Sequence, residues 1–396
     1  MKLSPEIQEK FRKFRHNRRA FWSLVALAAL FLAALPAELT CNDKPILLVL
    51  DGRPYLPAFR DYCLRDFGGA GELPITSYRS ALFRNFLAGQ ALPNDPAQLF
   101  GDAARSLPIP AATAARPHRH WILWAPVRHS HKSVNANPQS GRLALIAPWS
   151  GTDPVTKATI GGAWNDGHYF GTDQEGKDVL ARIVYGFRIS MLFGLGLALS
   201  GTLIGCLFGA IQGFFGGWVD LLGQRIEEIW ASLPQLYLLI IFSSFLAASK
   251  LDMTDTQHLL LLFAILNLTA WMGMSVQMRA QFLRGRNLEY VRAARALGVS
   301  SFRIMHRHIL PNSLTPVITF FPFAVTGGIL ALVSLDFLSL GVKYPAPSLG
   351  ELLAQGQANL HATWILTPTF LLLTVTLTLL TFIGDGVRNA FDPRTK

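Results

Sequence analysis

The sequence predicts an all-α polytopic membrane protein with six transmembrane helices and a large insertion after the first of them. Hydrophobic residues make up 51% of the 396 residues, charged residues only 15%, and the mean hydropathy is +0.31. These values are too apolar and too poor in charge for an ordinary soluble domain. The apolar residues are also gathered into long charge-free runs, which excludes an intrinsically disordered chain.

Six stretches lack Asp, Glu, Lys and Arg over about the 20 residues that a helix needs to cross the hydrocarbon core. They are 20–37, 189–219, 229–249, 259–278, 309–335 and 362–384. The second is longer than one crossing requires, so we expect its membrane part at 189–209. The first has an alternative interpretation as a cleaved secretory signal. An uncleaved helix is favoured, because the basic region before it is long and no clean cleavage site follows.

The positions of Lys and Arg predict that both chain ends lie in the cytoplasm. With the N-terminus inside, half of the 36 Lys and Arg residues fall on the cytoplasmic side, whereas the short outer connections hold only Lys250 and Lys343. This is the positive-inside pattern, and it explains the net charge of +11 without a nucleic-acid partner. One inner loop is net negative, because it holds Asp220, Glu227 and Glu228. The predicted parts are a basic tail (1–19), the first helix (20–37), an outer insertion (38–188), a five-helix core (189–384) with a cytoplasmic loop (279–312), and a C-terminal tail (385–396).

The insertion is polar and rich in Pro, and two short apolar runs in it, 45–50 and 121–127, are typical of strands. It forms either a small packed cap or a loosely wrapped loop. Cys41 and Cys63 both fall in it, and in an oxidising compartment they either form a disulfide or remain two thiols. Cys206, in the second span, has a packing role.

Two motifs point to local structure rather than to chemistry. The segment from Gly171 to Asp178 matches a phosphate-binding loop up to its last position, where the motif needs a hydroxyl for Mg²⁺ and the chain has a carboxylate. We therefore expect no ATP hydrolysis by this chain. A second motif places glycine at every fourth residue of the second span, which predicts a face where another helix approaches closely; the residues are Gly201, Gly205, Gly209, Gly213 and Gly217.

The cytoplasmic loop 279–312 is the most informative stretch of the chain. A short helix is expected to end at Gly298, and a second helix to begin near Ser300 or Ser301. Tyr290, Ala294 and Leu297 follow one another at spacings of four and three, which places them on one side of the first helix. The loop thus predicts an apolar knob ringed by arginines, suited to the groove of a partner protein.

The residues of this loop carry a family resemblance. Ala293-Ala294, Gly298 and Leu310-Pro311 resemble the EAA loop of bacterial ABC importer permeases, the coupling element that contacts the ATPase subunit. The stretches 168–190, 216–220, 307–312, 336–341 and 384–393 resemble the C-type subunit of the dipeptide and oligopeptide permease family. Within the insertion, 66–69 and 121–126 resemble the E subunit of Yej-type permeases, whose relatives import peptides and the peptide-nucleotide antibiotic microcin C.

The resemblance implies one half of a translocation pathway for oligopeptides or peptide-like compounds in a bacterial inner membrane. A second permease subunit would complete a heterodimer, ABC ATPase subunits would dock on the cytoplasmic face, and a periplasmic peptide-binding protein would deliver the substrate. It implies no cofactor and no catalytic residue, because ATP is hydrolysed by the separate ATPase. The family's coupling role is carried over to Tyr290, Arg292, Ala293, Ala294, Leu297, Gly298, Leu310 and Pro311, although Arg292 stands where the family has Glu.

Polar residues within the spans are candidates for the substrate pathway or for hydrogen bonds between helices; they are Gln212, Asn267, Gln277 and, at the edge of the fifth span, Asp336. The pairs His118/His120 and His129/His131 have the spacing of a metal site on strands, but no Cys or carboxylate completes either pair, and we predict no metal. The rival functions are a transporter driven by an ion gradient, an ABC permease for a non-peptide substrate, and a membrane enzyme. The first and last are disfavoured, because the six stretches contain no Asp, Glu, Lys or Arg.

Overall fold

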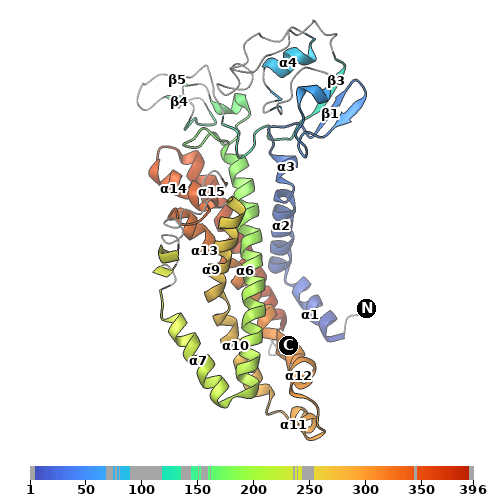
Figure 1. Ribbon diagram of the computed structural model, residues 1–396, viewed down its shortest axis with the longest axis vertical. Coiled ribbons are helices and arrows are strands. Elements are labelled where there is room, and N and C mark those ends of the chain that lie inside the picture. The colour runs from blue at the N-terminus through green and yellow to red at the C-terminus, as the bar shows by residue number, and fades with distance from the viewer. Residues whose placement is uncertain are drawn as a thin grey trace. The chain divides into compact units, whose positions relative to one another are not determined.

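The chain folds into two compact units, one formed by Met1–Leu32 with Gly186–Lys396 (unit 1) and the other by Ala33–Tyr185 (unit 2) (Figure 1). The structure is a computed structural model. It describes residues 5–67, 75, 78–79, 81–89, 118–134, 144–149, 151–152, 159–160, 162–234, 237–238, 240–242, 254–342 and 346–391.

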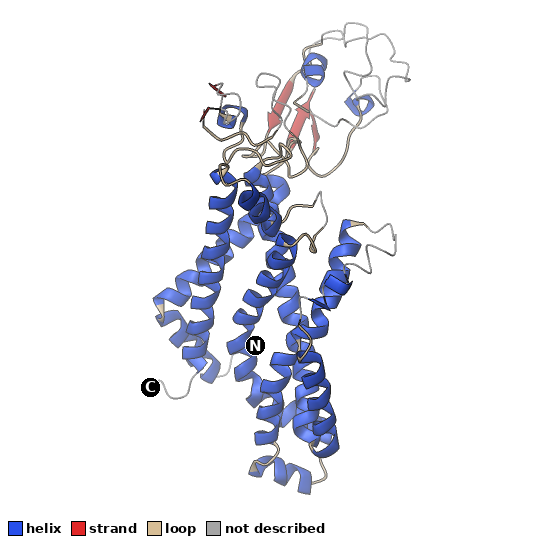
Figure 2. Cartoon of the chain, turned by 90° about the vertical axis from the view of Figure 1, so that its left-hand side faces the viewer, coloured by secondary structure: helices blue, strands red, loops and turns tan. Residues whose placement is uncertain are grey.

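Unit 1 is helical, as its long apolar runs predict. Figure 2 shows its long helices running side by side, and strands occur in the described part of unit 2. α13 packs against both α14 and α15. The helices are α1 (Pro5–His16), α2 (Arg18–Ala34), α6 (Val179–Phe215, which begins in unit 2), α7 (Gly217–Ala231), α9 (Asp255–Ala270), α10 (Met272–Gly285), α11 (Glu289–Ala296), α12 (Ser301–Arg303), α13 (Leu314–Phe337), α14 (Leu349–Ala358) and α15 (Thr363–Phe391), with a π-helix, η4 (Ile304–Ile309), and a 3₁₀-helix, η5 (Leu310–Ser313), between α12 and α13.

Four helical stretches in the described residues are long and apolar enough to cross a membrane. A fifth is added if α1 and α2, which meet at a bend of 88°, count as one broken span. The third stretch predicted from the sequence, 229–249, begins in the last turn of α7 and otherwise lies largely outside the described residues. Six crossings therefore remain a prediction. The four stretches are Val179–Phe215, Thr256–Gly285, Ser301–Phe337 and Thr363–Phe391.

Two helices, α6 and α15, are longer than the charge-free runs that predicted them. In α6 a charged residue inside the helix is paired, and in α15 the end of the helix packs against other helices. α6 begins at Val179, ten residues before the predicted start, because its first turns hold Arg182 fully buried in an ion pair with Asp173. α15 continues to Phe391, although a tail was predicted from 385. A methyl group on Gly386 would lie 2.1 Å from the Ala20 side chain, and Ala390 is buried against Phe14, so this end of the helix packs on the N-terminal helices.

Unit 2 is not helical throughout, so the predicted all-α class holds only for unit 1. Its main sheet has the order β2-β1-β3, with β1 (Leu47–Leu50) antiparallel to both β2 (Arg53–Tyr55) and β3 (His120–Leu123). The two strands predicted at 45–50 and 121–127 are confirmed, and they pair with each other. Asp51 and Gly52, both with positive φ, form the two-residue turn between β1 and β2. The smaller elements are α3 (Ala37–Thr40), η1 (Leu64–Phe67), α4 (Ala81–Leu87), β4 (Gly151–Thr152), β5 (Thr159–Ile160) and η3 (Ala163–Asp166).

Cys41 and Cys63 are separate thiols in the structure, the first buried and the second half-buried. Cys41 is buried in a cluster with Ala37, Val127 and Tyr185. Cys63 lies directly before η1, where its backbone N–H donates to the Asp66 carboxylate at 2.8 Å. The two thiols thus belong to different parts of unit 2.

Candidate functional site

A cavity of about 760 Å³ opens among the helices of unit 1. Its wall comes from α6, α9, α10 and α13, together with the end of α7 and the Leu233-Pro234 segment that follows. Among the described residues that line it there is no Asp, Glu, Lys, Arg or His. Its polar side chains are Thr202, Thr269 and Gln277, and the others include Trp230, Phe320, Phe323 and Met274. A space of this size with apolar walls and few polar groups has the character of a small-molecule site.

Of the four residues predicted for a pathway, Gln277 lines this cavity. Gln212 and Asn267 join helices instead: Asn267 Oδ1 accepts from Ser200 at 2.6 Å, which links α9 to α6. Asp336 closes a turn after α13, where it accepts from Val342 N–H at 2.7 Å and from the Ser348 hydroxyl at 2.5 Å. Of these four residues, Gln277 lines the cavity, whereas the side chains of Gln212, Asn267 and Asp336 form hydrogen bonds within the helical unit.

Two polar joints fix α7 against its neighbours. The buried Glu227 carboxylate accepts from Gln212 Nε2 on α6 at 2.9 Å and from Ser275 Oγ on α10 at 2.5 Å. Seven residues earlier on α7, Asp220 accepts from Arg279 Nη2 at 2.8 Å. The end of α7 forms part of the cavity wall, so these joints set the position of that wall. The sequence indicated the two acids only as charges of an inner loop. Their spacing of seven places them on one helix face, which is a signal of a shared polar face but not of its partners.

The glycine stripe of α6 packs directly on α9 and α10. A methyl group added to Gly205 would lie 2.4 Å from the carbonyl oxygen of Trp271, and one added to Gly209 would lie 2.2 Å from that of Ser275. Gly201 and Gly213 are similarly close to Ala270 and Arg279. Gly217 is the exception, because it starts α7 with a positive φ and has no atom within 4 Å of its added methyl group. Four of the five glycines thus provide the predicted close approach.

The loop between α10 and α13 has the predicted bent form. α11 ends just before Gly298, whose φ of +75° is the left-handed conformation that glycine adopts readily. The backbone N–H of Val299 then donates to the Ala294 carbonyl at 3.1 Å, and α12 begins at Ser301. A π-helix and a 3₁₀-helix complete the connection to α13. We call Glu289–Ser313 the elbow element; it lies at one end of unit 1, around the labels α11 and α12 in Figure 1.

One side of the elbow element is anchored and the other is exposed. Val291, Ala294, Ile304 and Ile309 are buried in one apolar cluster with Phe214 of α6 and Phe282 of α10. Ala294 therefore faces inward and not into the predicted exposed knob. Leu297 is 84% exposed, and Ala293, Arg292 and Pro311 are also exposed, while Leu310 is half-buried.

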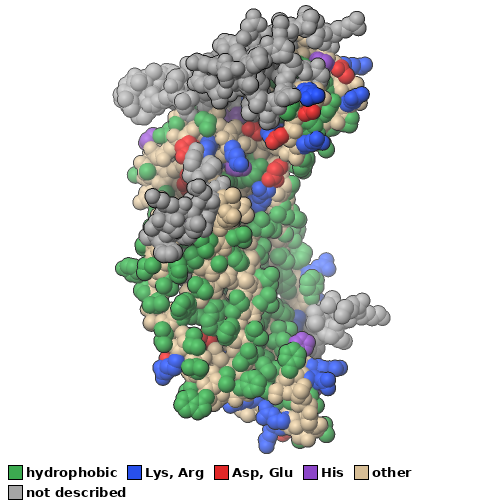
Figure 3. All heavy atoms as spheres, viewed as in Figure 1, with side chains coloured by type: hydrophobic (Ala, Val, Ile, Leu, Met, Phe, Trp, Pro, Cys, Tyr) green, Lys and Arg blue, Asp and Glu red, His purple; other side chains and the backbone are tan. Residues whose placement is uncertain are grey.

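The elbow element is also closed by polar contacts. Asn312 Nδ2 donates to the Tyr290 hydroxyl at 3.3 Å and to the His308 carbonyl at 3.2 Å, and Tyr290 donates to that carbonyl at 3.4 Å. These bonds connect α11 to η5 across the turn. Lys and Arg side chains gather at this end of unit 1, while hydrophobic side chains cover its middle on the same face (Figure 3). The element is thus a basic projection tied to the ends of α6 and α10.

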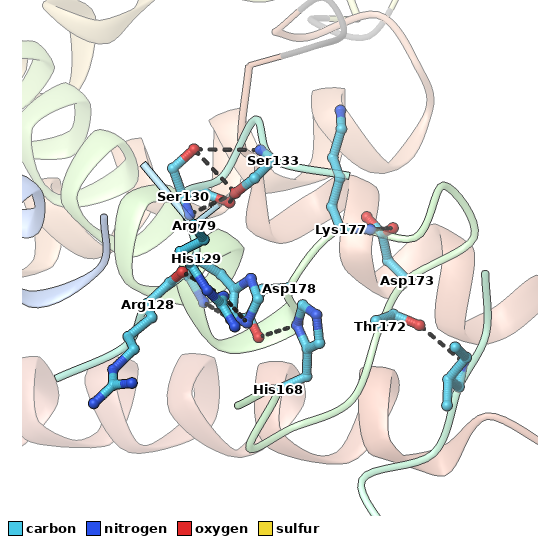
Figure 4. A network of polar contacts seen from close by, with 12 residues as sticks. Arg79, Arg128, His129, Ser130, Ser133, His168, Thr172, Asp173, Lys177 and Asp178 are labelled. Carbon is cyan, nitrogen blue, oxygen red and sulfur yellow. Dashed lines mark hydrogen bonds and ion pairs between the residues drawn. The ribbon is translucent and has the colours of Figure 1, made fainter. Parts of the chain in front are cut away.

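In unit 2, the segment that imitates a phosphate loop is a buried ionic network (Figure 4). Asp173 and Asp178 are fully buried, and so is Arg182, which forms an ion pair with Asp173. His168 Nδ1 lies 2.8 Å from Asp178 Oδ2, and the backbone N–H of Lys177 donates to Asp173 Oδ1 at 2.8 Å. The charged side chains of this segment therefore bind to each other and to its backbone, and these bonds stabilise the loop.

His118 and His129, one from each predicted histidine pair, contact different parts of unit 2. His118 Nδ1 lies 2.6 Å from Asp51 Oδ2 at one end of the main sheet, and the hydrogen bond with His118 holds the pKa of Asp51 below its usual range. The His129 ring stacks on His168, with centroids 3.7 Å apart. No cluster of three metal-ligating side chains occurs within the residues that the structure describes.

The sequence is similar to those of known membrane transport proteins. Residues 201–396 match the family of binding-protein-dependent transport system inner membrane components. The chain is 40% identical to the peptidoglycan transport system permease protein YejE of Agrobacterium fabrum, over 99% of this chain and 94% of that protein. It is 41% identical to the inner membrane ABC transporter permease protein YejE of Escherichia coli, over 99% of this chain and 98% of that protein.

A third relative covers only part of the chain. The oligopeptide transport system permease protein OppC of Haemophilus influenzae is 37% identical over 58% of this chain and 71% of that protein. The two YejE proteins, in contrast, match over nearly their whole length, insertion included. The chain therefore belongs to the family of inner-membrane permease subunits of binding-protein-dependent ABC transporters.

Proposed function

We propose that the chain forms half of the translocation pathway of an ATP-driven importer for short peptides or peptide-like compounds. The names of its relatives support this substrate class, because they are permeases for oligopeptides and peptidoglycan. The observation that carries the proposal is the uncharged cavity of unit 1. Peptides differ in side chains and charge, so a wide path without fixed charges admits them without strong preference. Microcin C, a peptide-nucleotide, has the same chemical character.

In this mechanism the chain carries out no hydrolysis. A second permease subunit completes the pathway, ABC ATPase subunits dock on the cytoplasmic face, and a periplasmic binding protein delivers the peptide. The elbow element transmits the movement of the ATPase through its anchored side to α6 and α10. The bundle then alternates between two packings, and the close contacts of the α6 glycines provide a smooth surface for that movement. Both chain ends lie in the cytoplasm, as the basic residues predict.

The insertion is proposed to lie in the periplasm and to contact the binding protein. Its supports are a sheet and core of its own and a match to the YejE relatives along nearly the whole chain. Deletion of residues 45–147 is expected to abolish uptake while the helical unit still assembles with its partners. Normal uptake by the deletion variant would refute this role.

A blocked cavity tests the pathway directly. Gly327 lines the cavity and has no atom within 4 Å of an added methyl group, so the side chain in Gly327→Trp begins in open space at the cavity wall. In proteoliposomes with the ATPase, the partner permease and the binding protein, we expect this variant to lose uptake of a labelled peptide and to keep ATP hydrolysis. Leu330→Trp is the control, because Leu330 is on the same helix, 41% exposed and outside the lining. Unchanged uptake by Gly327→Trp would contradict the proposed path.

A further inference from the structure

We propose that α1 lies flat on the membrane surface and, with the first turn of α2, binds the headgroups of anionic phospholipids. This inference rests on α2 crossing the membrane, as the proposed function requires. α1 and α2 meet next to Asn17 at an angle of 88°. A helix at nearly a right angle to a spanning helix runs along the bilayer surface.

The apolar face of α1 is wider than the protein covers. Phe14 is buried against Ala20 and Ala390, but Phe11, one turn earlier on the same face, is 64% exposed. Trp22, in the first turns of α2, is also 64% exposed. Exposed aromatic rings beside the end of an apolar helix are typical of the level where headgroups meet acyl chains. Leu24, further along α2, is 42% exposed, so both α1 and α2 present exposed apolar side chains.

The positive charge of α1 and the first turn of α2 favours lipids with anionic headgroups. Arg12, Arg15, Arg18 and Arg19 are exposed, and no ion pair involves them among the described side chains. Lys10 is held over the ring of Phe391, at 4.9 Å from its centroid, which ties α1 to the end of α15. Glu9 pairs with Lys13 at 3.6 Å, and no ion pair between Glu9 and one of these arginines occurs among the described side chains. Phosphate oxygens of an anionic lipid supply a counter-charge for the arginines at the depth where Phe11 enters the bilayer.

Spin labels on the full-length chain in nanodiscs test the position of α1. Labels are attached to Phe11→Cys, Lys13→Cys and Leu24→Cys in a background with Cys41→Ala, Cys63→Ser and Cys206→Ala. We expect positions 11 and 24 to collide mainly with oxygen, which enters the bilayer, and position 13 mainly with a water-soluble nickel chelate. If position 24 is in lipid and position 11 is as accessible to nickel as position 13, α2 crosses the membrane but α1 does not lie on its surface. The inference about α1 is then wrong, and the proposed topology is unaffected. If position 24 is also in water, α2 does not cross and the proposed topology fails with it.

Lipid retention tests the headgroup site. The chain is purified from membranes that contain phosphatidylglycerol and phosphatidylcholine, and the lipids bound to it are measured by native mass spectrometry. Replacement of Arg12, Arg15, Arg18 and Arg19 by Gln is expected to reduce the bound phosphatidylglycerol several-fold and to leave phosphatidylcholine unchanged. The control removes equal charge from exposed residues of unit 2, by substitution of Arg53, Arg60, Arg65 and Arg119 with Gln. Equal retention of phosphatidylglycerol by both variants would overturn the lipid site.

Discussion

At the scale of residues, Glu227 is the clearest example of a side chain whose role depends on neighbours distant in sequence. It is 7% exposed and accepts hydrogen bonds from α6 and α10, yet its local sequence is that of a charged surface helix. Charge-free runs predict where helices cross, because that property is local. They do not predict which charges are paired, because the partners, Gln212 and Ser275, are 15 and 48 residues away.

Removal of the Glu227 carboxylate should destabilise the helical unit. Glu227→Ala leaves the amide of Gln212 and the hydroxyl of Ser275 without their acceptor in a buried site, which costs about 1–3 kcal/mol. We expect a lower melting temperature of the purified chain in detergent. Glu228→Ala is the control, since its side chain is 58% exposed in a pair with Arg225 and is worth less than about 1 kcal/mol. Equal melting temperatures of the two variants would contradict the joint.

The glycines of α6 give a second prediction. Gly209→Ala places a methyl group 2.2 Å from the Ser275 carbonyl, so α6 and α10 must separate and stability should fall by about 1–3 kcal/mol. Gly273→Ala, in α10, meets no atom within 4 Å and should stabilise slightly or have no effect. Thermal unfolding of both variants measures the difference. A Gly209→Ala protein as stable as the parent would show that the helices do not pack on this stripe.

The thiols of unit 2 should differ in reactivity. Burial raises the pKa of Cys41 to about 11 from an ordinary value of 9.0, so almost none of it is thiolate at neutral pH. Cys63 is only half-buried. A short pulse of maleimide at pH 7.5 should therefore modify Cys63 and spare Cys41, and both should react after unfolding. Mass spectrometry of the peptides gives the result; rapid labelling of Cys41 in the folded chain would contradict its burial.

At the scale of elements, the bend of the elbow element can be predicted from the sequence, but the side that it buries cannot. Gly298 and Ser300 predict the bend, because a left-handed turn and a helix start have local signatures. The inward position of Ala294 depends on Phe214 and Phe282 of other helices, and spacing within α11 alone does not reveal which side they cover. The boundary of α6 has the same cause: Arg188 ends the charge-free run, but the pairing of Arg182 with Asp173 allows the helix to begin earlier.

The exposed side of the elbow element should carry the contact with the ATPase. Leu297→Asp replaces an apolar side chain that is 84% exposed, so folding should be unaffected while docking in an apolar groove becomes unfavourable. In the reconstituted transporter we expect a fall of at least tenfold in peptide uptake, with an unchanged melting temperature of the chain. Phe302→Asp, on α12, tests how far the contact surface extends, since Phe302 is 77% exposed. Full uptake by both variants would remove the coupling role from this surface.

At the scale of the whole molecule, the two units differ in how far sequence determines them. Unit 1 follows from apolar length and glycine spacing, which are properties of single helices. In unit 2 the strands at β1 and β3 are predicted locally, but their pairing joins Leu47 to Leu123 across about half of the insertion. The ionic network around Asp173 and Arg182 is likewise a product of folding, and its charges do not mark a phosphate site.

Coupling of transport to ATP requires the elbow element to contact the ATPase, and photo-crosslinking in membranes tests that contact directly. A photoreactive amino acid replaces Leu297, and a matched one replaces Leu360, which is 72% exposed and lies two residues after the end of α14. Figure 1 shows α14 and α11 at opposite ends of unit 1. We predict a crosslinked product with the ATPase subunit from position 297 whose yield changes when ATP is added, and none from position 360. A product from position 360, or no ATPase product from position 297 in an actively transporting complex, would contradict the account.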